Sequence, residues 1–336
     1  MKVIVIGAGR MGVRHIQGVL TVDGIQKVTV VDINQAALDS AKANLAESLN
    51  FNKCDFTLVS QLNKDNKYDV GIIASTANNR EELFDLLVSL GCKNIMVEKP
   101  LGQSYQEVTA FDKKVAETNV NCSVNLNMRL YDNFIQLKED LKNTPQLKGV
   151  KTITINTGTI GIGANGIHYL DLLYFILDAD EAEIKAAHIS DDMIPSGRGG
   201  DFGDFGGWSA INLFKNKELV GTALISLSPI STVFGSWEIV APHGRIYFNE
   251  VEQKRINTYR KEDSTLPVNR YFGDYTPPIE SKFESPFLGD LTAKWIIGLQ
   301  NGQQLLPNIS ESCKVHKLMF DWLNHSNTHQ KLFPIT

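Results

Sequence analysis

The chain has 336 residues, of which 43% are hydrophobic and 21% charged, with a formal net charge of -5 and a pI near 5.8. This composition is typical of a globular protein with large apolar cores, and a chain of this length usually forms two domains. The acidic balance and the lack of a Lys/Arg cluster argue against nucleic-acid and membrane-surface binding. No segment approaches the roughly 20 apolar residues of a membrane span, so we expect a soluble protein.

The four cysteines of the chain show neither a CxxC pair nor a histidine at metal-ligand spacing. We expect no metal site, and we interpret the cysteines as reduced, mostly buried thiols of a cytoplasmic protein. The apolar run Val3–Ile6 after Lys2 is too short for a signal peptide and leads directly into glycines. It is better explained as a buried strand.

Strands and helices are expected to alternate in the first third of the chain. The expected strands are Lys2–Ile6, Lys27–Val31, Thr57–Val59, Tyr68–Ala74, Asn94–Val97 and Val120–Val124. Helical patterns lie between them, at Met11–Leu20, Gln35–Leu49, Arg80–Leu90 and Tyr105–Thr118. Such alternation predicts βαβ units around a parallel sheet. We therefore expect an α/β Rossmann domain over residues 1–123.

After Lys148 the expected strands follow one another. They are Lys151–Asn156, Ala182–Ile189, Trp208–Phe214, Leu219–Ser226, Ser236–Ala241 and Arg245–Asn249. Helices are expected near Asn133–Leu141, His168–Leu177, Pro286–Leu299 and Ser310–Ser326. This pattern predicts an α+β domain over residues 124–336 with one large, mostly antiparallel sheet. The glycine-rich stretch Ser196–Gly207 is expected to be a mobile loop.

A glycine-rich turn follows the first expected strand and precedes the first expected helix. Gly7 permits the tight turn, Gly9 lets the backbone approach a pyrophosphate, and Gly12 allows close packing of helix and strand. The N–H groups and the dipole at the start of the helix favour phosphate. A turn of some other α/β fold is the alternative. The dinucleotide-binding residues expected in this turn are Gly7, Gly9, Arg10, Met11 and Gly12.

An acidic residue stands where the dinucleotide fingerprint requires one. Asp32 ends the second expected strand, about 20 residues after the turn. Its carboxylate can accept hydrogen bonds from the adenosine ribose and would repel a 2′-phosphate, so NAD is expected rather than NADP. Arg10 weakens this preference, because an arginine near the ribose can tolerate the extra phosphate.

Four motifs, in order, resemble those of a known family. They are the glycine turn, Ile73-Ala74-Ser75-Thr76, Val97-Glu98-Lys99-Pro100-Leu101-Gly102 and Gly166-Ile167-His168-Tyr169-Leu170-Asp171. In these motifs the chain resembles the Gfo/Idh/MocA oxidoreductases, named after glucose–fructose oxidoreductase and inositol dehydrogenase. The resemblance implies a C-terminal open-faced sheet, often buried in a homodimer or homotetramer, and a sugar or cyclitol substrate.

The resemblance makes Lys99 the central catalytic residue and implies a cis bond to Pro100. Transfer of a hydride from an alcohol carbon needs the hydroxyl proton removed. A partly desolvated lysine near a positively charged nicotinamide should have a lowered pKa, so it can act as base or hydrogen-bond donor. The alternative is a surface lysine before a proline that starts a helix.

His168 is the second catalytic candidate. Asp171 lies three residues further on the same helix face and can orient the imidazole. The alternative is a capping histidine beside a solvated aspartate. Many members of the family carry an aspartate four residues before this histidine, where this chain has Ala164. Either Asp171 or Asn165 compensates, or Lys99 and His168 work alone.

Further residues are expected around the cofactor and the substrate. Ser75, Thr76 and Asn78 follow a strand and should line the nicotinamide ribose, and Glu98 should also contact the cofactor. By resemblance, Asn127 and Arg129 lie near the cofactor and the substrate. Asn165 is also expected to bind the substrate. Arg198 can clamp a carboxylate or diphosphate, or is a surface arginine in a loop.

These features together predict an NAD-dependent dehydrogenase that acts on a secondary alcohol or ketone of a sugar, nucleotide sugar or cyclitol. Family analogy favours sugars or nucleotide sugars of surface-polysaccharide pathways. One alternative is the reduction of a non-sugar carbonyl or ring. Another is a catalytically silent sensor that binds NAD and a metabolite and signals through protein contacts.

Overall fold

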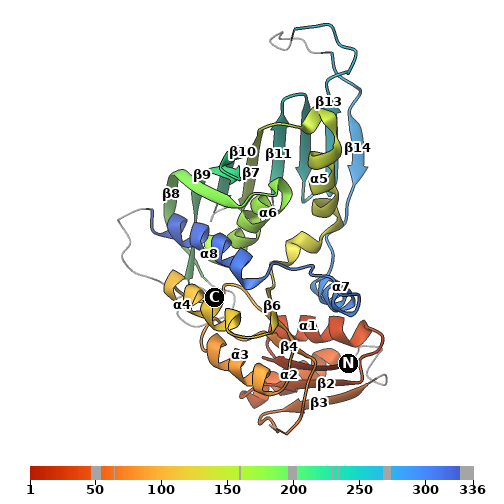
Figure 1. Cartoon of the computed structure of the whole chain (residues 1–336), viewed down its shortest axis with the longest axis vertical. Coiled ribbons are helices and arrows are strands. Elements are labelled where there is room, and N and C mark those ends of the chain that lie inside the picture. Colours follow the sequence, from red (N-terminus) through yellow and green to blue (C-terminus); the bar gives the residue numbers. More distant parts are fainter. Residues whose placement is uncertain are drawn as a thin grey trace. The chain divides into compact units, whose positions relative to one another are not determined.

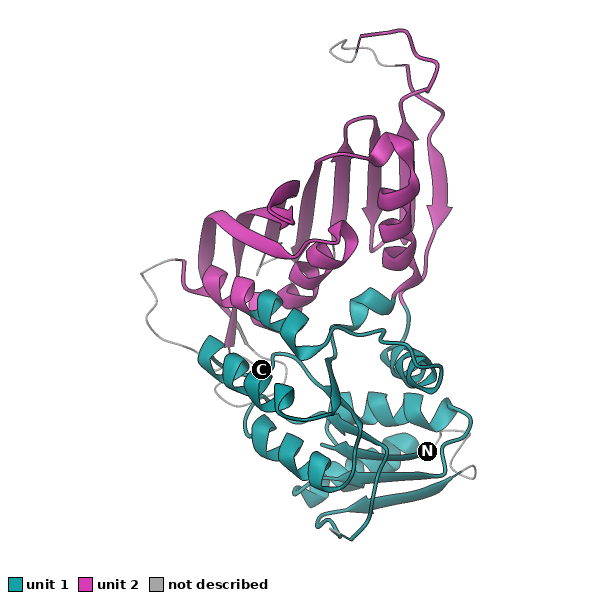
Figure 2. Cartoon of the chain, in the orientation of Figure 1, with its two compact units in different colours: residues 1–130, 286–316, 336 teal, residues 131–285, 317–335 magenta. Residues whose placement is uncertain are grey.

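The computed structural model describes residues 1–46, 54–63, 65–158, 160–195, 203–228, 231–233, 235–267 and 274–325. They form two compact units, which Figure 2 distinguishes by colour. The first unit contains Met1–Leu130 and Pro286–His316, and the second contains Tyr131–Ser285 and, among the described residues, 317–325. The first unit thus includes a segment that we expected in the second domain.

The first unit is built on a six-stranded parallel sheet in the order β3-β2-β1-β4-β5-β6 (Figure 1). Its strands are β1 (Lys2–Ile6), β2 (Lys27–Val31), β3 (Asp55–Val59), β4 (Val70–Ile73), β5 (Asn94–Val97) and β6 (Asn121–Val124). The connecting helices are α1 (Arg10–Thr21), α2 (Gln35–Leu45), α3 (Arg80–Ser89) and α4 (Tyr105–Ala116). This is the expected Rossmann topology. The strand order reverses between β1 and β4, where sheets of this kind bind their ligands.

The apolar runs of the strands explain why this sheet is covered on both faces. Val3, Ile4 and Val5 are all completely buried although their side chains alternate between the faces of β1. The helix α7 (Leu288–Gln300) packs against α1. A Cβ atom on Gly18 would lie 2.0 Å from the carbonyl oxygen of Gly289, so the two helices meet backbone to backbone. This close contact explains why the segment belongs to the first unit.

The second unit contains an eight-stranded sheet in the order β14-β13-β12-β11-β7-β10-β9-β8. Its strands are β7 (Lys151–Gly158), β8 (Glu181–Pro195), β9 (Gly203–Lys215), β10 (Glu218–Ser228), β11 (Ser236–Ala241), β12 (Gly244–Asn249), β13 (Lys254–Tyr259) and β14 (Ile279–Lys282). All neighbours pair antiparallel except β7 and β10, which are parallel. The sheet is mostly antiparallel, as expected.

One face of this sheet is packed and the other is exposed. Helices α5 (Asp132–Asn143) and α6 (Ile167–Leu177) are drawn over the sheet in Figure 1, and α8 (Ile309–Leu323) belongs to the second unit from Lys317. Trp237 is completely buried and contacts the rings of Phe134, Tyr169 and Phe248. On the opposite face, large apolar side chains remain exposed.

The structure corrects three expectations about the second unit. Residues 203–207, which we expected in a mobile loop, begin strand β9; residues 196–202 lie outside the described residues. Strands β13 and β14 were not expected. Both carry mixed polar and apolar residues, with no clean two-residue alternation that sequence inspection could detect.

Two kinds of feature are absent from the residues that the structure describes. None of their helices has the length and apolar character needed to cross a bilayer. In the same part of the chain, no group of three or more His, Cys, Asp and Glu side chains is arranged to hold a metal ion.

A buried histidine of α8 holds the chain just after β5. His316 is completely buried, and its Nε2 atom accepts a hydrogen bond of 2.9 Å from the backbone N–H of Leu101. Its Nδ1 atom donates to the carbonyl oxygen of Ser312 at 2.7 Å. Burial lowers the pKa of His316 to about 4, with a further contribution from the charges of Arg80 and Lys99. The neutral ring is therefore the form that fits this site.

We predict that His316 makes the stability of the protein fall in mild acid. The unfolded chain protonates this histidine near pH 6.5 and the folded protein only near pH 4. Between these values the unfolded state binds more protons, so the free energy of unfolding falls as the pH is lowered, by up to roughly 3 kcal/mol. Urea unfolding from pH 7.5 to 4 measures this slope.

The substitution His316→Gln should flatten the slope, because the amide oxygen can still accept from Leu101 but does not titrate. The exposed His243→Gln is the matched control and should retain the parent slope. An unchanged slope in His316→Gln would contradict the assignment.

Candidate active site

The glycine turn between β1 and α1 has the geometry that its three glycines require. Gly7 has φ +106°, and a Cβ atom there would lie 2.9 Å from the carbonyl group of Ala74. A Cβ atom on Gly12 would lie 1.9 Å from the carbonyl oxygen of Gly7. By contrast, a Cβ on Gly9 would meet no described atom within 4 Å. The space above Gly9 is therefore open for a ligand to approach the backbone.

The residues of the turn fit a dinucleotide. Arg10, which is exposed, and Met11 form the first residues of α1, so the helix start faces the turn with its N–H groups. Asp32 follows β2, and its carboxylate accepts hydrogen bonds from the N–H groups of Ala8 at 2.7 Å and Asn34 at 2.8 Å. The carboxylate of Asp32 is thus hydrogen-bonded directly to the glycine turn. Its position in the sequence is the one that the dinucleotide fingerprint requires.

Residues after β4 continue the same edge of the sheet. Ser75 is half-buried, and Thr76 and Asn78 are exposed in the loop between β4 and α3. Because parallel strands end at one edge, this loop lies beside the glycine turn, as the contact between Gly7 and Ala74 shows. These three side chains are therefore available to a ligand of that edge.

Lys99 lies where β5 ends, and it is only 5% exposed. The bond between Lys99 and Pro100 is cis, as the resemblance implied. A surface lysine before a helix is thus excluded, because Lys99 is buried and α4 begins only at Tyr105. Its position is that of a buried cationic side chain at the ligand-binding edge of the sheet.

The carboxylate of Glu98, the residue before the lysine, is buried and accepts hydrogen bonds at both oxygens. Its Oε1 atom accepts from His15 Nε2 at 2.9 Å and from Asn125 Nδ2 at 2.7 Å, and its Oε2 atom accepts from the N–H of Lys99 at 3.2 Å. Burial alone would raise the pKa of Glu98. The hydrogen bonds and the positive charges of His15 and Lys99 outweigh burial and hold this pKa well below its usual range.

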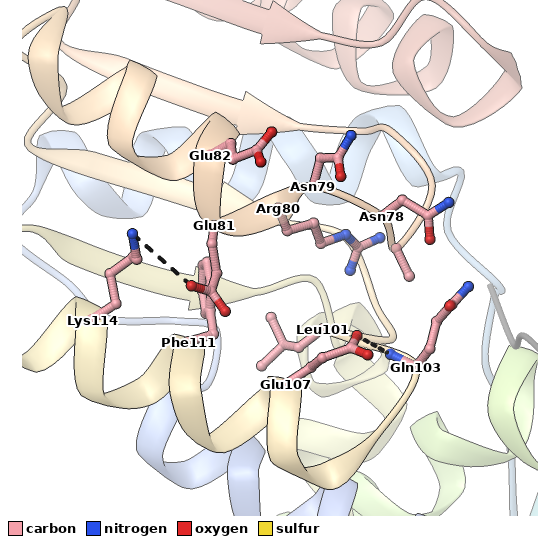
Figure 3. Close-up of a pocket in the computed structure, with 11 residues that line it drawn as sticks. Asn78, Asn79, Arg80, Glu81, Glu82, Leu101, Gln103, Glu107, Phe111 and Lys114 are labelled. Atoms are coloured by element: carbon pink, nitrogen blue, oxygen red, sulfur yellow. Dashed lines mark hydrogen bonds and ion pairs between the residues drawn. The ribbon is translucent and has the colours of Figure 1, made fainter.

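The side chain of Arg80 holds the backbone of the segment around the cis Lys99–Pro100 bond. This residue is 2% exposed, and its guanidinium donates to the carbonyl oxygens of Glu98 and Pro100 and, at 3.2 Å, of Ser75. Arg80 also lines a pocket of about 410 Å³ between α3 and α4, together with Leu101 and other residues shown in Figure 3. Arginine at the start of a helix gives no sequence signal for this role.

Asn127 and Arg129 lie in a short 3-10 helix, Asn127–Leu130, after β6. Asn127 is buried, whereas Arg129 is partly exposed and lies 3.8 Å from the carboxylate of Glu311. Both follow a strand that ends at the ligand-binding edge. Sequence inspection placed them correctly after this strand; their roles toward a ligand stay predictions.

The remaining candidates belong to the second unit. His168 lies in the first turn of α6 and is 9% exposed, and Asp171, in the same helix, is completely buried. The alternative of a solvated aspartate is therefore wrong. Asn165 is exposed in the turn before α6, and Arg198 lies outside the described residues. Because Lys99 and His168 belong to different units, their convergence on one substrate stays a prediction.

An aspartate that the sequence analysis missed holds the start of the α6 segment. The carboxylate of Asp204, from β9, accepts hydrogen bonds from the N–H groups of Gly163 at 3.0 Å, Ala164 at 2.5 Å and Phe205 at 2.9 Å. It thereby caps the helical turn one turn before His168. No motif marked this residue, because it comes from a strand 40 positions after Ala164.

Comparison with known proteins supports the N-terminal assignment. The family profile described as "Oxidoreductase family, NAD-binding Rossmann fold", of the Gfo/Idh/MocA group, matches residues 1–126. The chain is 26% identical to the myo-inositol 2-dehydrogenase of Thermotoga maritima over 143 residues, which are 43% of this chain and 41% of that protein. The chain therefore spans about two-fifths of the curated relatives that it matches.

Two solved structures extend the similarity of fold to nearly the whole chain. An oxidoreductase from Agrobacterium radiobacter, in complex with NAD+, L-tartaric acid and magnesium, has a TM-score of 0.72 at 14% identity and covers 97% of both chains. The WlbA dehydrogenase from Bordetella pertussis, in complex with NADH and UDP-GlcNAcA, has a TM-score of 0.68 at 16% identity and covers 96% of this chain and 94% of its own. Residues 1–126 are thus similar to the NAD-binding Rossmann domain of the Gfo/Idh/MocA oxidoreductases.

Proposed function

We propose that this protein is an NAD-dependent oxidoreductase that interconverts a secondary alcohol and its ketone on a sugar, nucleotide sugar or cyclitol. The observation that carries the proposal is the buried Lys99 at the carboxyl end of β5, on the sheet edge that also holds the glycine turn. A cationic side chain buried beside a dinucleotide-binding turn is suited to proton transfer during redox chemistry.

The residues of the chain divide the proposed reaction between them. NAD, when bound, supplies the acceptor or donor of the hydride. The turn around Gly9 and the carboxylate of Asp32 hold the pyrophosphate and the ribose. Lys99 takes the hydroxyl proton in oxidation and returns it in reduction, and His168 assists at the same oxygen. Ser75, Thr76 and Asn78 bind the nicotinamide ribose.

Substrate contacts are proposed for the polar residues that border this edge and for those of the second unit. Asn127, Arg129, Asn165 and Arg198 are the proposed substrate-binding residues, with Asp171 orienting His168. These polar side chains together can form the several hydrogen bonds that a substrate rich in hydroxyl groups requires. The four cysteines are free, and three are buried, which suits the reducing conditions of the cytoplasm.

Turnover should depend on Lys99. We expect a panel of sugars, nucleotide sugars and inositols to contain a compound that drives NADH formation. The substitution Lys99→Met removes the proton acceptor at nearly constant volume and should lower kcat about 10²- to 10⁴-fold. The exposed Lys113→Met is the control and should keep parent activity.

Turnover retained in Lys99→Met would refute the mechanism. NADH binding without turnover of any compound would favour a sensor, and turnover of non-sugar carbonyls alone a different reductase.

Cofactor preference should depend on Asp32. The protein should bind NADH more tightly than NADPH, because the carboxylate repels a 2′-phosphate. Asp32→Ala should reduce this preference about ten- to a hundredfold, the contribution of hydrogen bonds to a charged group. Titration by cofactor fluorescence measures both affinities, with the exposed Asp39→Ala of α2 as control. A parent protein that prefers NADPH, or an unchanged preference in Asp32→Ala, would contradict the assignment.

We further propose a homodimer or homotetramer formed through the exposed face of the second sheet. Trp208, Leu224 and Val240 on three of its strands are 45%, 52% and 43% exposed. Apolar side chains gathered on one sheet face are typical of an interface. Leu224→Glu should therefore yield monomers in analytical ultracentrifugation, whereas Val251→Glu, in the turn after β12, should not. A monomeric parent protein would exclude this interface.

A further inference from the structure

Four buried polar side chains form a cluster that includes Glu98, the residue before Lys99. They come from separate parts of the first unit: His15 from α1, Glu98 from the end of β5, Asn125 from the end of β6 and Thr292 from α7. Their exposed fractions are 0%, 1%, 4% and 2%. Burying so many polar groups is costly unless each is paired, so such a cluster calls for a function.

The hydrogen bonds of the cluster run in one chain. Thr292 Oγ1 lies 2.9 Å from His15 Nδ1, and His15 Nε2 donates to Glu98 Oε1 at 2.9 Å. Asn125 donates to the same oxygen at 2.7 Å, and the N–H of Lys99 donates to Glu98 Oε2 at 3.2 Å. Both ring nitrogens of His15 therefore have oxygen partners. The series of hydrogen bonds ends at the backbone N–H of Lys99.

This arrangement links the cofactor-binding turn to the reactive segment. His15 stands three residues after Gly12, on the buried face of the helix that begins at the glycine turn. Its ring reaches the carboxylate beside Lys99 directly. The orientation of α1 and the position of the Lys99 backbone are thus fixed by one and the same side chain.

The carboxylate also carries charge. The donors around Glu98 keep it ionised, because its pKa lies well below the usual range. Lys99, the next residue, feels this charge, since the two side chains interact electrostatically. The charges of Arg80 and Lys99 both act on His316, so Arg80 adds a second positive charge to this part of the first unit. The carboxylate of Glu98 is the negative charge that acts together with Lys99.

We propose that the buried His15–Glu98 pair is a positioning device for Lys99: it fixes the lysine backbone to the cofactor-binding helix and holds a negative charge beside the ammonium group. This inference rests on the proposed function of Lys99 as proton carrier. In reduction the ammonium gives a proton to the carbonyl oxygen as NADH gives a hydride to the carbon, which leaves an alcohol, NAD+ and a neutral amine. A nearby anion favours the proton-donating form.

The direct test measures the protonation of Lys99 without turnover. In the full-length protein labelled with 13C-lysine, the Cε signal of Lys99 is identified by its absence from Lys99→Gln and titrated against pH. Glu98→Gln preserves volume and removes the charge, so the midpoint of Lys99 should fall by about one unit or more. The exposed Glu117→Gln is the control and should leave the midpoint unchanged.

A second variant separates positioning from charge and covers the case in which Glu98→Gln does not fold. His15→Gln retains the carboxylate but loses the ring that ties it to α1. The midpoint of Lys99 should stay at or above the parent value, while kcat falls about tenfold or more, as displaced catalytic groups do. The dissociation constant for NADH should change little, because the glycine turn remains.

Two results would overturn the proposal. One is a folded Glu98→Gln whose Lys99 midpoint equals that of the parent; the other is a fall in His15→Gln as large as the one expected for Glu98→Gln. Failure of this positioning proposal can be distinguished from failure of the proposed function. A protein without dehydrogenase activity can still show the titration shift, and an active enzyme dependent on Lys99 can lack it.

Discussion

The contact between Gly12 and Gly7 is the constraint on which the first unit depends. The first turn of α1 approaches the end of β1 so closely that a Cβ atom on Gly12 would lie 1.9 Å from the carbonyl oxygen of Gly7. This approach fixes the helix against the strand, opens the space above Gly9 and brings the N–H of Ala8 to the carboxylate of Asp32. The same helix carries His15 into the interior, so the turn also determines where the buried cluster forms.

Buried charged groups gather at one place in the first unit. The core of the second unit is rich in aromatic rings around Trp237, and its buried charged residues, such as Asp171 of α6 and Arg255 of β13, lie on separate elements. The first unit buries Glu98, Lys99, Arg80 and His316 around one short segment. Buried charges are expensive unless they are paired, and they gather where a protein performs chemistry. Their concentration after β5 agrees with the proposed reaction at that edge.

The parallel sheet and the glycine turn could be predicted from the sequence, because both depend on local sequence patterns. Apolar runs and helical periodicity predicted all six parallel strands, and glycine spacing predicted the turn. What sequence could not supply were contacts between distant segments. His15 is an ordinary helix residue in the sequence, and only the fold brings it to Glu98, 83 positions later. In the same way, Asp204 caps a turn that contains Ala164, 40 positions earlier. The one available signal was that helical spacing places His15 on the same buried face as Gly12 and Val19.

The division of the chain has a consequence for how the protein is made. The first unit is interrupted after Leu130 and resumes at Pro286, and the resumed segment supplies Thr292, Gly289 and His316 to its interior. During synthesis the Rossmann sheet emerges early, yet its polar cluster has no partner on α7 until residues 131–285 of the second unit have been translated. The first unit is therefore completed only after most of the second has been made, so a gene fragment that stops at residue 130 encodes its sheet without α7 and His316.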